Sequence, residues 1–143
     1  EHVEVANVYN LIGKAYRRKN SSDRAIENYE HSLDIYLKVL GSNHIKVSNC
    51  YYNIATALTD LKEYSKAIKY YNKALSIDLK FPGQIESVAA TYHNIGTNYA
   101  ELGNYKRAKR FLLKAKSVLI KIHGPKHHSV MQTQELIRQL KSH

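Results

Sequence analysis

Apolar residues recur at steps of three and four along most of the chain, which is the pattern of helices with one buried face. Tyr51, Ile54 and Leu58 follow this spacing, so their side chains would lie on one stripe of a helix. A second stripe of the same kind begins after Lys62-Glu63 and covers residues 67–75. The pattern predicts two amphipathic helices joined by a short turn. A helix pair of this size needs neighbouring pairs to bury its apolar stripes.

The same helix pair occurs three times. The small residues Gly13, Ala55 and Gly96 are separated by 42 and 41 positions, and other positions align around them. The aligned triplets are Val5, Val47 and Val88; Tyr9, Tyr51 and Tyr92; Ile12, Ile54 and Ile95; Ala25, Ala67 and Ala108; Tyr29, Tyr71 and Leu112; and Ser32, Ala74 and Ala115. The small residues at the positions of Gly13 and Ala25 in each repeat allow its two helices to approach closely. We therefore predict three repeats, at about residues 2–43, 44–84 and 85–126.

Residues that end helices separate the repeats. Gly41, Pro82-Gly83 and Gly124-Pro125 follow the second helix of each pair, where glycine accepts the left-handed conformation and proline stops the helix. The predicted helices cover residues 3–19, 22–40, 45–61, 64–80, 86–102, 105–122 and 128–141. Arg138 occupies the small-residue position of the last helix, so we expect a capping helix at 128–141 rather than the start of a further repeat. The predicted fold is an all-α, right-handed α-solenoid of three helix pairs plus a C-terminal capping helix, in a single domain of residues 1–143.

Charge and composition narrow the function. The chain has 22 Lys and Arg against 12 Asp and Glu, and ten of these basic residues with only three acidic ones lie in residues 84–143. Such a basic surface attracts acidic partners. One cysteine, Cys50, excludes an internal disulfide framework, and we interpret it as a packing residue. The apolar runs are too short for a membrane span, so we expect a cytoplasmic protein, and we expect the chain to be a fragment of a larger one.

The motif Tyr92-x-x-Ile95-Gly96-x-x-Tyr99, followed by Ala108 and Ala115, resembles the tetratricopeptide repeat (TPR). The length of 41 or 42 residues, with linkers such as Leu40-Gly41-Ser42-Asn43-His44, is similar to the long repeats of kinesin light chains. The linkers depart from that family at Ile45 and His128, where it prefers proline, and Leu58 replaces its usual tyrosine. The resemblance implies a protein-interaction module, a scaffold or adaptor that is not an enzyme.

The resemblance also implies a site, because the first helix of each TPR lines a concave groove that holds an extended peptide. The positions that face the groove are Asn10, Lys14 and Arg17 with Asn7 and Arg18 in the first repeat, Tyr52, Asn53 and Thr56 with Asn49 and Thr59 in the second, and His93, Asn94 and Thr97 with Ala90 and Ala100 in the third. Asparagine amides can pair with any peptide backbone, and the cations favour an acidic peptide. Ala90 and Asn94 replace the basic residues of a carboxylate clamp, so we do not expect recognition of a free C-terminus.

Two alternatives remain open at this point. The chain could be a regulatory or sensor domain of a larger enzyme. It could also be a basic helical domain that binds nucleic acid or anionic lipid at residues 106–121, where basic residues occur without any acidic one. We expect that face only to aid solubility, because no aromatic residues for base stacking are interleaved on it.

Sites for chemistry are not expected. The sequence lacks a phosphate-binding glycine loop, a zinc-protease motif and a nucleophile elbow. His123, His127 and His128 could together bind a metal, but Gly124-Pro125 interrupts the helix between them. We therefore predict no catalytic residue, no metal site, no cofactor and no small-molecule substrate.

Overall fold

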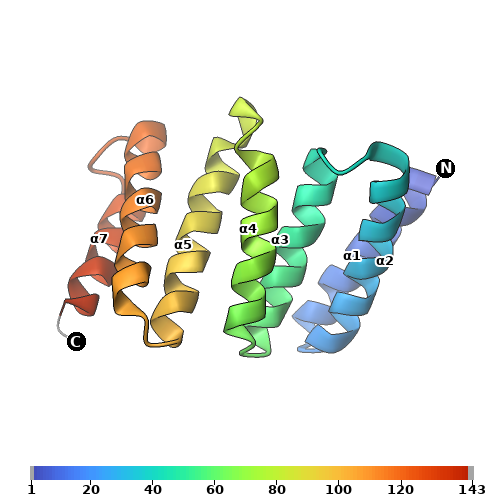
Figure 1. Ribbon diagram of the computed structural model, residues 1–143, viewed down its shortest axis with the longest axis horizontal. Coiled ribbons are helices and arrows are strands. Elements are labelled where there is room, and N and C mark those ends of the chain that lie inside the picture. The colour runs from blue at the N-terminus through green and yellow to red at the C-terminus, as the bar shows by residue number, and fades with distance from the viewer. Residues whose placement is uncertain (1, 142–143) are drawn as a thin grey trace. The chain divides into compact units, whose positions relative to one another are not determined.

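The computed structural model describes residues 2–141, and within this range the chain forms seven α-helices, one short 3₁₀ helix and no strand (Figure 1). The helices are α1 (His2–Arg18), α2 (Ser22–Leu40), α3 (Ile45–Asp60), α4 (Tyr64–Asp78), α5 (Ile85–Glu101), α6 (Tyr105–His123) and α7 (His128–Leu140), with the 3₁₀ helix η1 at Pro82–Gln84. The all-α prediction is confirmed. Each predicted boundary is correct to within two residues.

The chain divides into two compact units, Glu1–Ile77 and Asp78–His143. Unit 1 contains α1 to α4 up to Ile77, and unit 2 contains η1 and α5 to α7. The single domain of residues 1–143 stays a prediction. Its residues 1 and 142–143 lie outside the described part of the chain.

The helices of unit 1 pack in chain order, α1 on α2, α2 on α3 and α3 on α4. The prediction of close approach at the small residues is confirmed for Gly13, because a Cβ there would lie 2.6 Å from Cε1 of Tyr29. Buried serines bridge both helix pairs. The hydroxyl of Ser32 donates to the carbonyl of Ala6 at 2.8 Å, and that of Ser48 to the carbonyl of Ala74 at 3.2 Å.

In unit 2, α6 packs against both α5 and α7. Gly96 repeats the close approach, since a Cβ there would lie 2.8 Å from Cγ of Leu112. On α7, Val130 and Ile137 are buried while Arg138 is exposed and pairs with Glu135 at 2.6 Å. Met131 on the same helix is also exposed, and the capping role of α7 stays a prediction.

The helix ends use repeated devices. The turn after the first helix of each pair contains a residue with positive φ, at Asn20 (62°), Lys62 (61°) and Gly103 (79°), and the bonds around it close the helix in a Schellman-type turn. The linker histidines are N-caps. Nδ1 of His44 accepts from the backbone N–H of Lys46 at 3.0 Å, and His127 caps α7 in the same way.

Two further predictions concern burial. Cys50 is 1% exposed, and burial raises the pKa of its thiol, which agrees with a packing role. Among the described helices, none has the length and apolar content that crossing a bilayer requires.

Candidate functional site

We call the side of α1 and α3 that carries the predicted site residues the inner face of unit 1; polar side chains of these two helices, the first of their pairs, meet there. Nδ2 of Asn53 on α3 donates to Oδ1 of Asn10 on α1 at 2.9 Å. This bond joins two of the predicted site residues across the boundary between the first and second repeats. It leaves the second N–H and the carbonyl oxygen of Asn53, and the N–H₂ group of Asn10, available for a ligand.

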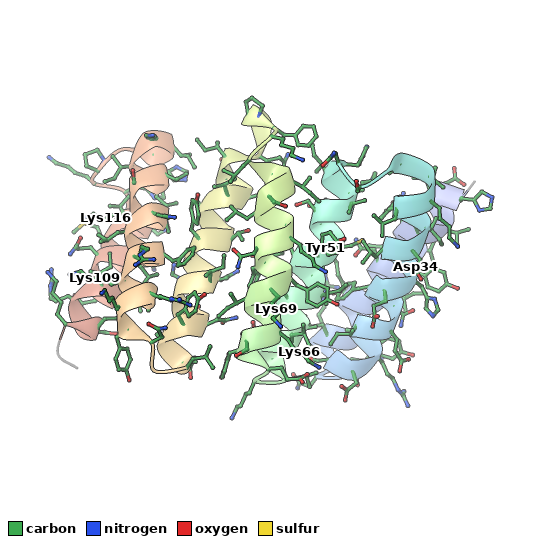
Figure 2. All side chains as sticks on the ribbon, viewed as in Figure 1. Asp34, Tyr51, Lys66, Lys69, Lys109 and Lys116 are labelled. Carbon is green, nitrogen blue, oxygen red and sulfur yellow. The ribbon has the colours of Figure 1, made fainter. Side chains whose placement is uncertain are left out.

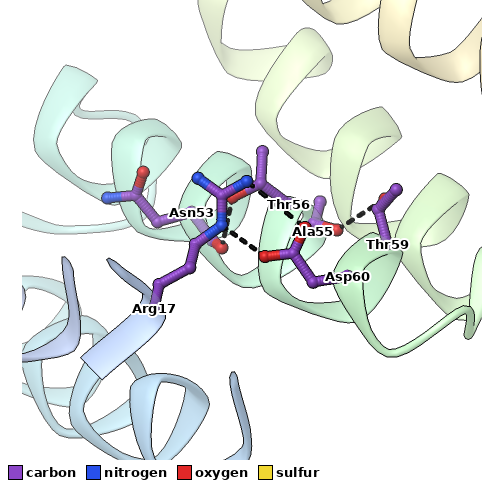
Figure 3. A network of polar contacts seen from close by, with 6 residues as sticks. All are labelled: Arg17, Asn53, Ala55, Thr56, Thr59 and Asp60. Carbon is purple, nitrogen blue, oxygen red and sulfur yellow. Dashed lines mark hydrogen bonds and ion pairs between the residues drawn. The ribbon is translucent and has the colours of Figure 1, made fainter. Parts of the chain in front are cut away.

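A second bridge joins the same helices through charge. Nε of Arg17 lies 2.6 Å from Oδ2 of Asp60 and Nη2 lies 3.4 Å from Oδ1 (Figure 3). The hydrogen bond from Arg17 to Asp60 holds the pKa of Arg17 above its usual value, against the opposing effect of burial. The two side chains are 43% and 39% exposed, so solvent screens the pair and it contributes little stability. One predicted site residue therefore already has a carboxylate partner.

Sequence reasoning missed Asp60, although the spacing carried a signal. Arg17 and Asp60 are 43 positions apart, as are Asn10 and Asn53. Both sequence separations exceed the 42-residue length of the repeat by one residue. Side chains one residue out of register with the repeat thus meet across α1 and α3. A search for complementary residues at this offset would have found the pair.

A pocket of about 560 Å³ opens beside the Arg17–Asp60 pair. Its lining residues are Lys14, Arg17, Arg18, Asn20, Tyr29, Asn53 and Asp60. Three cations and one carboxylate give it a positive charge. Neither Lys14 nor Arg18 forms an ion pair with a described residue. The structure thus brings Lys14, Arg17 and Asn53 together, and the pocket suits an anionic group.

A smaller pocket of about 210 Å³ continues the inner face of unit 1 toward the start of α1. It is lined by Asn7, Asn10, Leu11, Tyr36, Lys46 and Asn49. Three amides face one cavity here, and the hydroxyl of Tyr36 donates to Oδ1 of Asn7. Such a lining offers both donors and acceptors to a peptide backbone.

The remaining predicted residues of unit 1 lie farther along α3. Tyr52 is half-buried, with its ring in an edge-on contact with Tyr71 at 5.5 Å between centroids. The hydroxyl of Thr56 donates to the carbonyl of Asn53 at 2.9 Å (Figure 3). The hydroxyl proton of Thr56 is therefore already donated within α3. The hydroxyl oxygen could only accept a hydrogen bond from a ligand.

In unit 2, the predicted residues His93, Asn94 and Thr97 all lie on α5 and are half-buried. Burial lowers the pKa of His93 and so favours the neutral form of its ring. The hydroxyl of Thr97 donates to the carbonyl of Asn94 at 3.0 Å, in the same way as Thr56 in unit 1. Unit 2 therefore presents uncharged groups at these positions.

Thr97 also lines a pocket of about 420 Å³ within unit 2. The lining comes from α5, α6 and α7 and consists of Thr97, Ala100, Glu101, Tyr105, Leu112, Leu136, Gln139 and Leu140. The three leucines make this pocket more apolar than the pockets of unit 1, and sequence reasoning missed it because α7 was interpreted only as a cap. The nine predicted peptide-binding residues stay a prediction.

The expectation that the basic 106–121 face carries no aromatic residue is wrong. Phe111 lies on α6 among the cations, and its ring contacts Tyr92 and Tyr99 of α5 at 6.2 and 5.6 Å between centroids. Nζ of Lys114 lies 5.1 Å from the centre of the Phe111 ring, and Arg107 lies 5.7 Å from that of Tyr99. Phe111 stands among these cations in the sequence itself, whereas its contacts with the tyrosines of α5 are visible only in the structure.

The histidine cluster has a structural role. The rings of His123 and His127 stack with centroids 4.1 Å apart, and His128 lies 4.3 Å from His127. Nδ1 of His127 accepts from the backbone N–H of Ser129 at 3.2 Å. Within residues 2–141, no group of three His, Cys, Asp or Glu has an arrangement that could hold a metal ion.

Consecutive helix pairs, with a glycine at the close contact of α1 with α2 and of α5 with α6, define a helical-repeat protein of the α-solenoid class. Tetratricopeptide-repeat family models match residues 2–80 and residues 88–129. The chain therefore belongs to the tetratricopeptide-repeat family, as the motif predicted. A search among curated proteins gives no match.

Solved structures agree with this assignment. BtubC (BKLC) from P. vanneervenii is 23% identical with a TM-score of 0.89, over 99% of this chain and 57% of that one. A chain from Podosopora anserina with nearly identical TPR-like repeats of kinesin light chain type is 19% identical with a TM-score of 0.81, over 98% of this chain and 66% of that one. Aspartyl phosphate phosphatase F from Bacillus subtilis is 24% identical with a TM-score of 0.85, over 98% of this chain and 36% of that one. This chain thus spans about a third to two thirds of these relatives, and the low identities show the fold alone.

Proposed function

We propose that this protein is an interaction module that holds an extended acidic segment of another protein against the inner face of unit 1, on α1 and α3. The observation that carries the proposal is the positive pocket of unit 1, where Lys14, Arg17 and Arg18 surround about 560 Å³. A carboxylate side chain of the partner enters this pocket. It is attracted by two cations that have no ion-pair partner among the described residues.

The amides hold the backbone of the same segment. Asn10 and Asn53 fix each other's orientation through their 2.9 Å bond, so their remaining donors and acceptors are pre-positioned and lose little entropy on binding. Asn94 is the equivalent of Asn53 in the third repeat and lies on α5 of unit 2. Backbone pairing of this kind favours an extended segment with few requirements on its sequence.

The test measures the affinity of a Glu-rich peptide and of a matched peptide with Gln in place of Glu. In the Lys14→Gln/Arg18→Gln variant, we expect the Glu-rich peptide to bind roughly 2- to 30-fold more weakly, from two exposed charge pairs. The matched control is Lys19→Gln/Lys38→Gln, which removes two exposed lysines that do not line the pocket. Equal losses in the two variants would refute a defined acidic pocket.

Asp60 gives a second and opposite test. The carboxylate of Asp60 pairs with the guanidinium of Arg17 at 2.6 Å. It therefore competes with an acidic side chain of the partner for Arg17. Asp60→Asn should therefore strengthen binding of the Glu-rich peptide by a few-fold and leave the Gln peptide unchanged. Weaker binding of the Glu-rich peptide by Asp60→Asn would mean that the partner contacts Asp60 itself, and the acidic proposal would be wrong.

A further inference from the structure

The second and third repeats carry the same arrangement of rings and cations on the edge where their two helices meet. In unit 1, Tyr51 of α3 and Tyr70 of α4 have centroids 6.1 Å apart at 47°, and Nζ of Lys73 lies over both rings at 5.4 and 5.0 Å. In unit 2, Tyr92 and Phe111 have centroids 6.2 Å apart at 47°. The distances from Nζ of Lys114 to these two rings are 5.6 and 5.1 Å.

More cations line the same side of each second helix. Lys66 and Lys69 precede Tyr70 on α4, and Arg107 and Arg110 precede Phe111 on α6, at equivalent positions of the repeat. Figure 2 shows Lys66 and Lys69 on α4 and Tyr51 on the neighbouring α3. Lys66 is 3.7 Å from Glu63. The other cations of the two arrays form no ion pair with a described residue.

The fold itself does not require this arrangement. At the equivalent positions of the first repeat, Glu27 replaces Lys69 and Asn28 replaces Tyr70, and α2 still forms and packs on α1. Tyr51, Tyr70 and Phe111 are half-buried, so part of each ring remains accessible. The second ring, at Tyr70 and Phe111, is therefore an addition to the repeat rather than a condition for its packing, whereas the first repeat keeps the other ring at Tyr9 and a cation at Arg24.

We infer that these two ring–cation arrays bind single-stranded nucleic acid. Half-exposed rings beside lysines and arginines supply the two contacts that sequence-independent strand binding needs, base stacking and phosphate neutralisation. The Cβ atoms of residues three or four apart on one side of a helix are about 5–6 Å apart, so the cations form a row that a linear chain of phosphates can follow. An anionic membrane or an acidic protein would use the cations, but neither has bases that stack on the rings.

The test is fluorescence anisotropy with labelled oligo(dT) and oligo(rU) of about twelve nucleotides. The aromatic variant is Tyr70→Asn/Phe111→Asn, which installs the residue that the first repeat already carries at this position. We expect a loss of affinity of about 5-fold or more for each ring, with an unchanged salt slope. Circular dichroism verifies the fold, and Tyr105→Asn, at an exposed ring outside both arrays, is the matched control.

The cations are tested by Lys69→Gln/Lys73→Gln/Arg110→Gln/Lys114→Gln. Removing four phosphate contacts should lower the slope of log affinity against log salt by about 3, at roughly 0.7 per contact. The control variant Lys19→Gln/Lys38→Gln/Lys62→Gln/Lys126→Gln removes the same charge from exposed lysines elsewhere. We expect it to retain most of the affinity.

Three results would overturn the inference. The first is the absence of binding at low salt, and the second is an equal loss in the two four-residue variants, which would reflect net charge alone. The third is a pattern in which the cation variant loses binding but the aromatic variant does not. With competition by polyglutamate or by anionic vesicles, that pattern would assign the face to an acidic protein or to a membrane instead.

Discussion

Gly13 offers the sharpest test of how the helix pairs pack. An alanine Cβ at this position would lie 2.6 and 2.7 Å from Cε1 and Cδ1 of Tyr29 and 3.1 Å from the carbonyl oxygen of Ala25. Carbon atoms in contact are normally about 3.5–4.0 Å apart. The ring of Tyr29 is 1% exposed, so it has no free space to move into.

The two opposing effects of Gly13→Ala can be compared. Replacing a glycine within a helix by alanine gains up to about 1 kcal/mol, because the unfolded chain loses freedom. Forcing one additional methyl group into a filled core costs about 1–3 kcal/mol. We expect the cost to exceed the gain, with a net loss of about 1–2 kcal/mol in the free energy of unfolding. Gly96→Ala should lose less, because its Cβ would meet the branched end of Leu112 at 2.8 Å rather than a rigid ring.

Urea unfolding followed by circular dichroism measures these free energies. The matched control is Gly83→Ala, because Gly83 has nothing within 4 Å of its added Cβ and no positive φ, so it should be neutral or slightly more stable. The expected order of stability is Gly83→Ala, then Gly96→Ala, then Gly13→Ala. A Gly13→Ala protein as stable as Gly83→Ala would refute the argument that close helix contact requires the small residue.

Three further predictions concern other parts of the chain. Lys62→Gly should raise the free energy of unfolding by about 1 kcal/mol, because Lys62 has φ of 61°, whereas Lys69→Gly within α4 should lower it by about the same amount. Thr91→Val should be neutral or stabilising by up to about 1 kcal/mol in urea unfolding, because the buried Thr91 hydroxyl has no hydrogen-bond partner among residues 2–141. Thr133→Val at the equivalent position should destabilise, since that hydroxyl donates to a backbone carbonyl at 2.9 Å. Burial raises the pKa of Tyr71 in the folded protein. The stabilisation from this shift is complete below about pH 10, the usual pKa of tyrosine, and is lost as the pH rises above that value. Tyr71→Phe should therefore reduce the loss of stability that alkaline unfolding curves measure.

The fold was predictable because packing residues repeat. The spacing of 42 and 41 residues between Gly13, Ala55 and Gly96 fixes where each close helix contact occurs, and glycine or proline marks each boundary. The largest boundary difference is at α4, which ends at Asp78 instead of residue 80. Asp78 is buried there and accepts a hydrogen bond from Ser87 at 2.7 Å. A contact with a residue nine positions later is not visible in a helix-period pattern.

The site was less predictable, because it depends on which side chains meet across helices. The sequence indicated that Arg17 and Asn53 share a face, but not that Asp60 would bind Arg17. It also assigned Tyr92 to packing, although the ring reaches the edge of α6 and meets Phe111. The 3.6-residue period places a residue on a side of its own helix. It does not state which residue of the neighbouring helix lies opposite, and polar contacts depend on that.

Positions that differ between repeats therefore carry more information about function than positions that agree. Lys14, Thr56 and Thr97 occupy one aligned position on the inner faces, and they are a cation and two hydroxyls. Packing cannot explain the lysine, since the other two repeats fold with threonine there. The same reasoning applies on the ring–cation edge, where Asn28 in the first repeat corresponds to Tyr70 and Phe111. Each unmatched residue is one that the repeat can replace without unfolding. Its substitution by the residue of another repeat consequently tests binding with little disturbance of the fold.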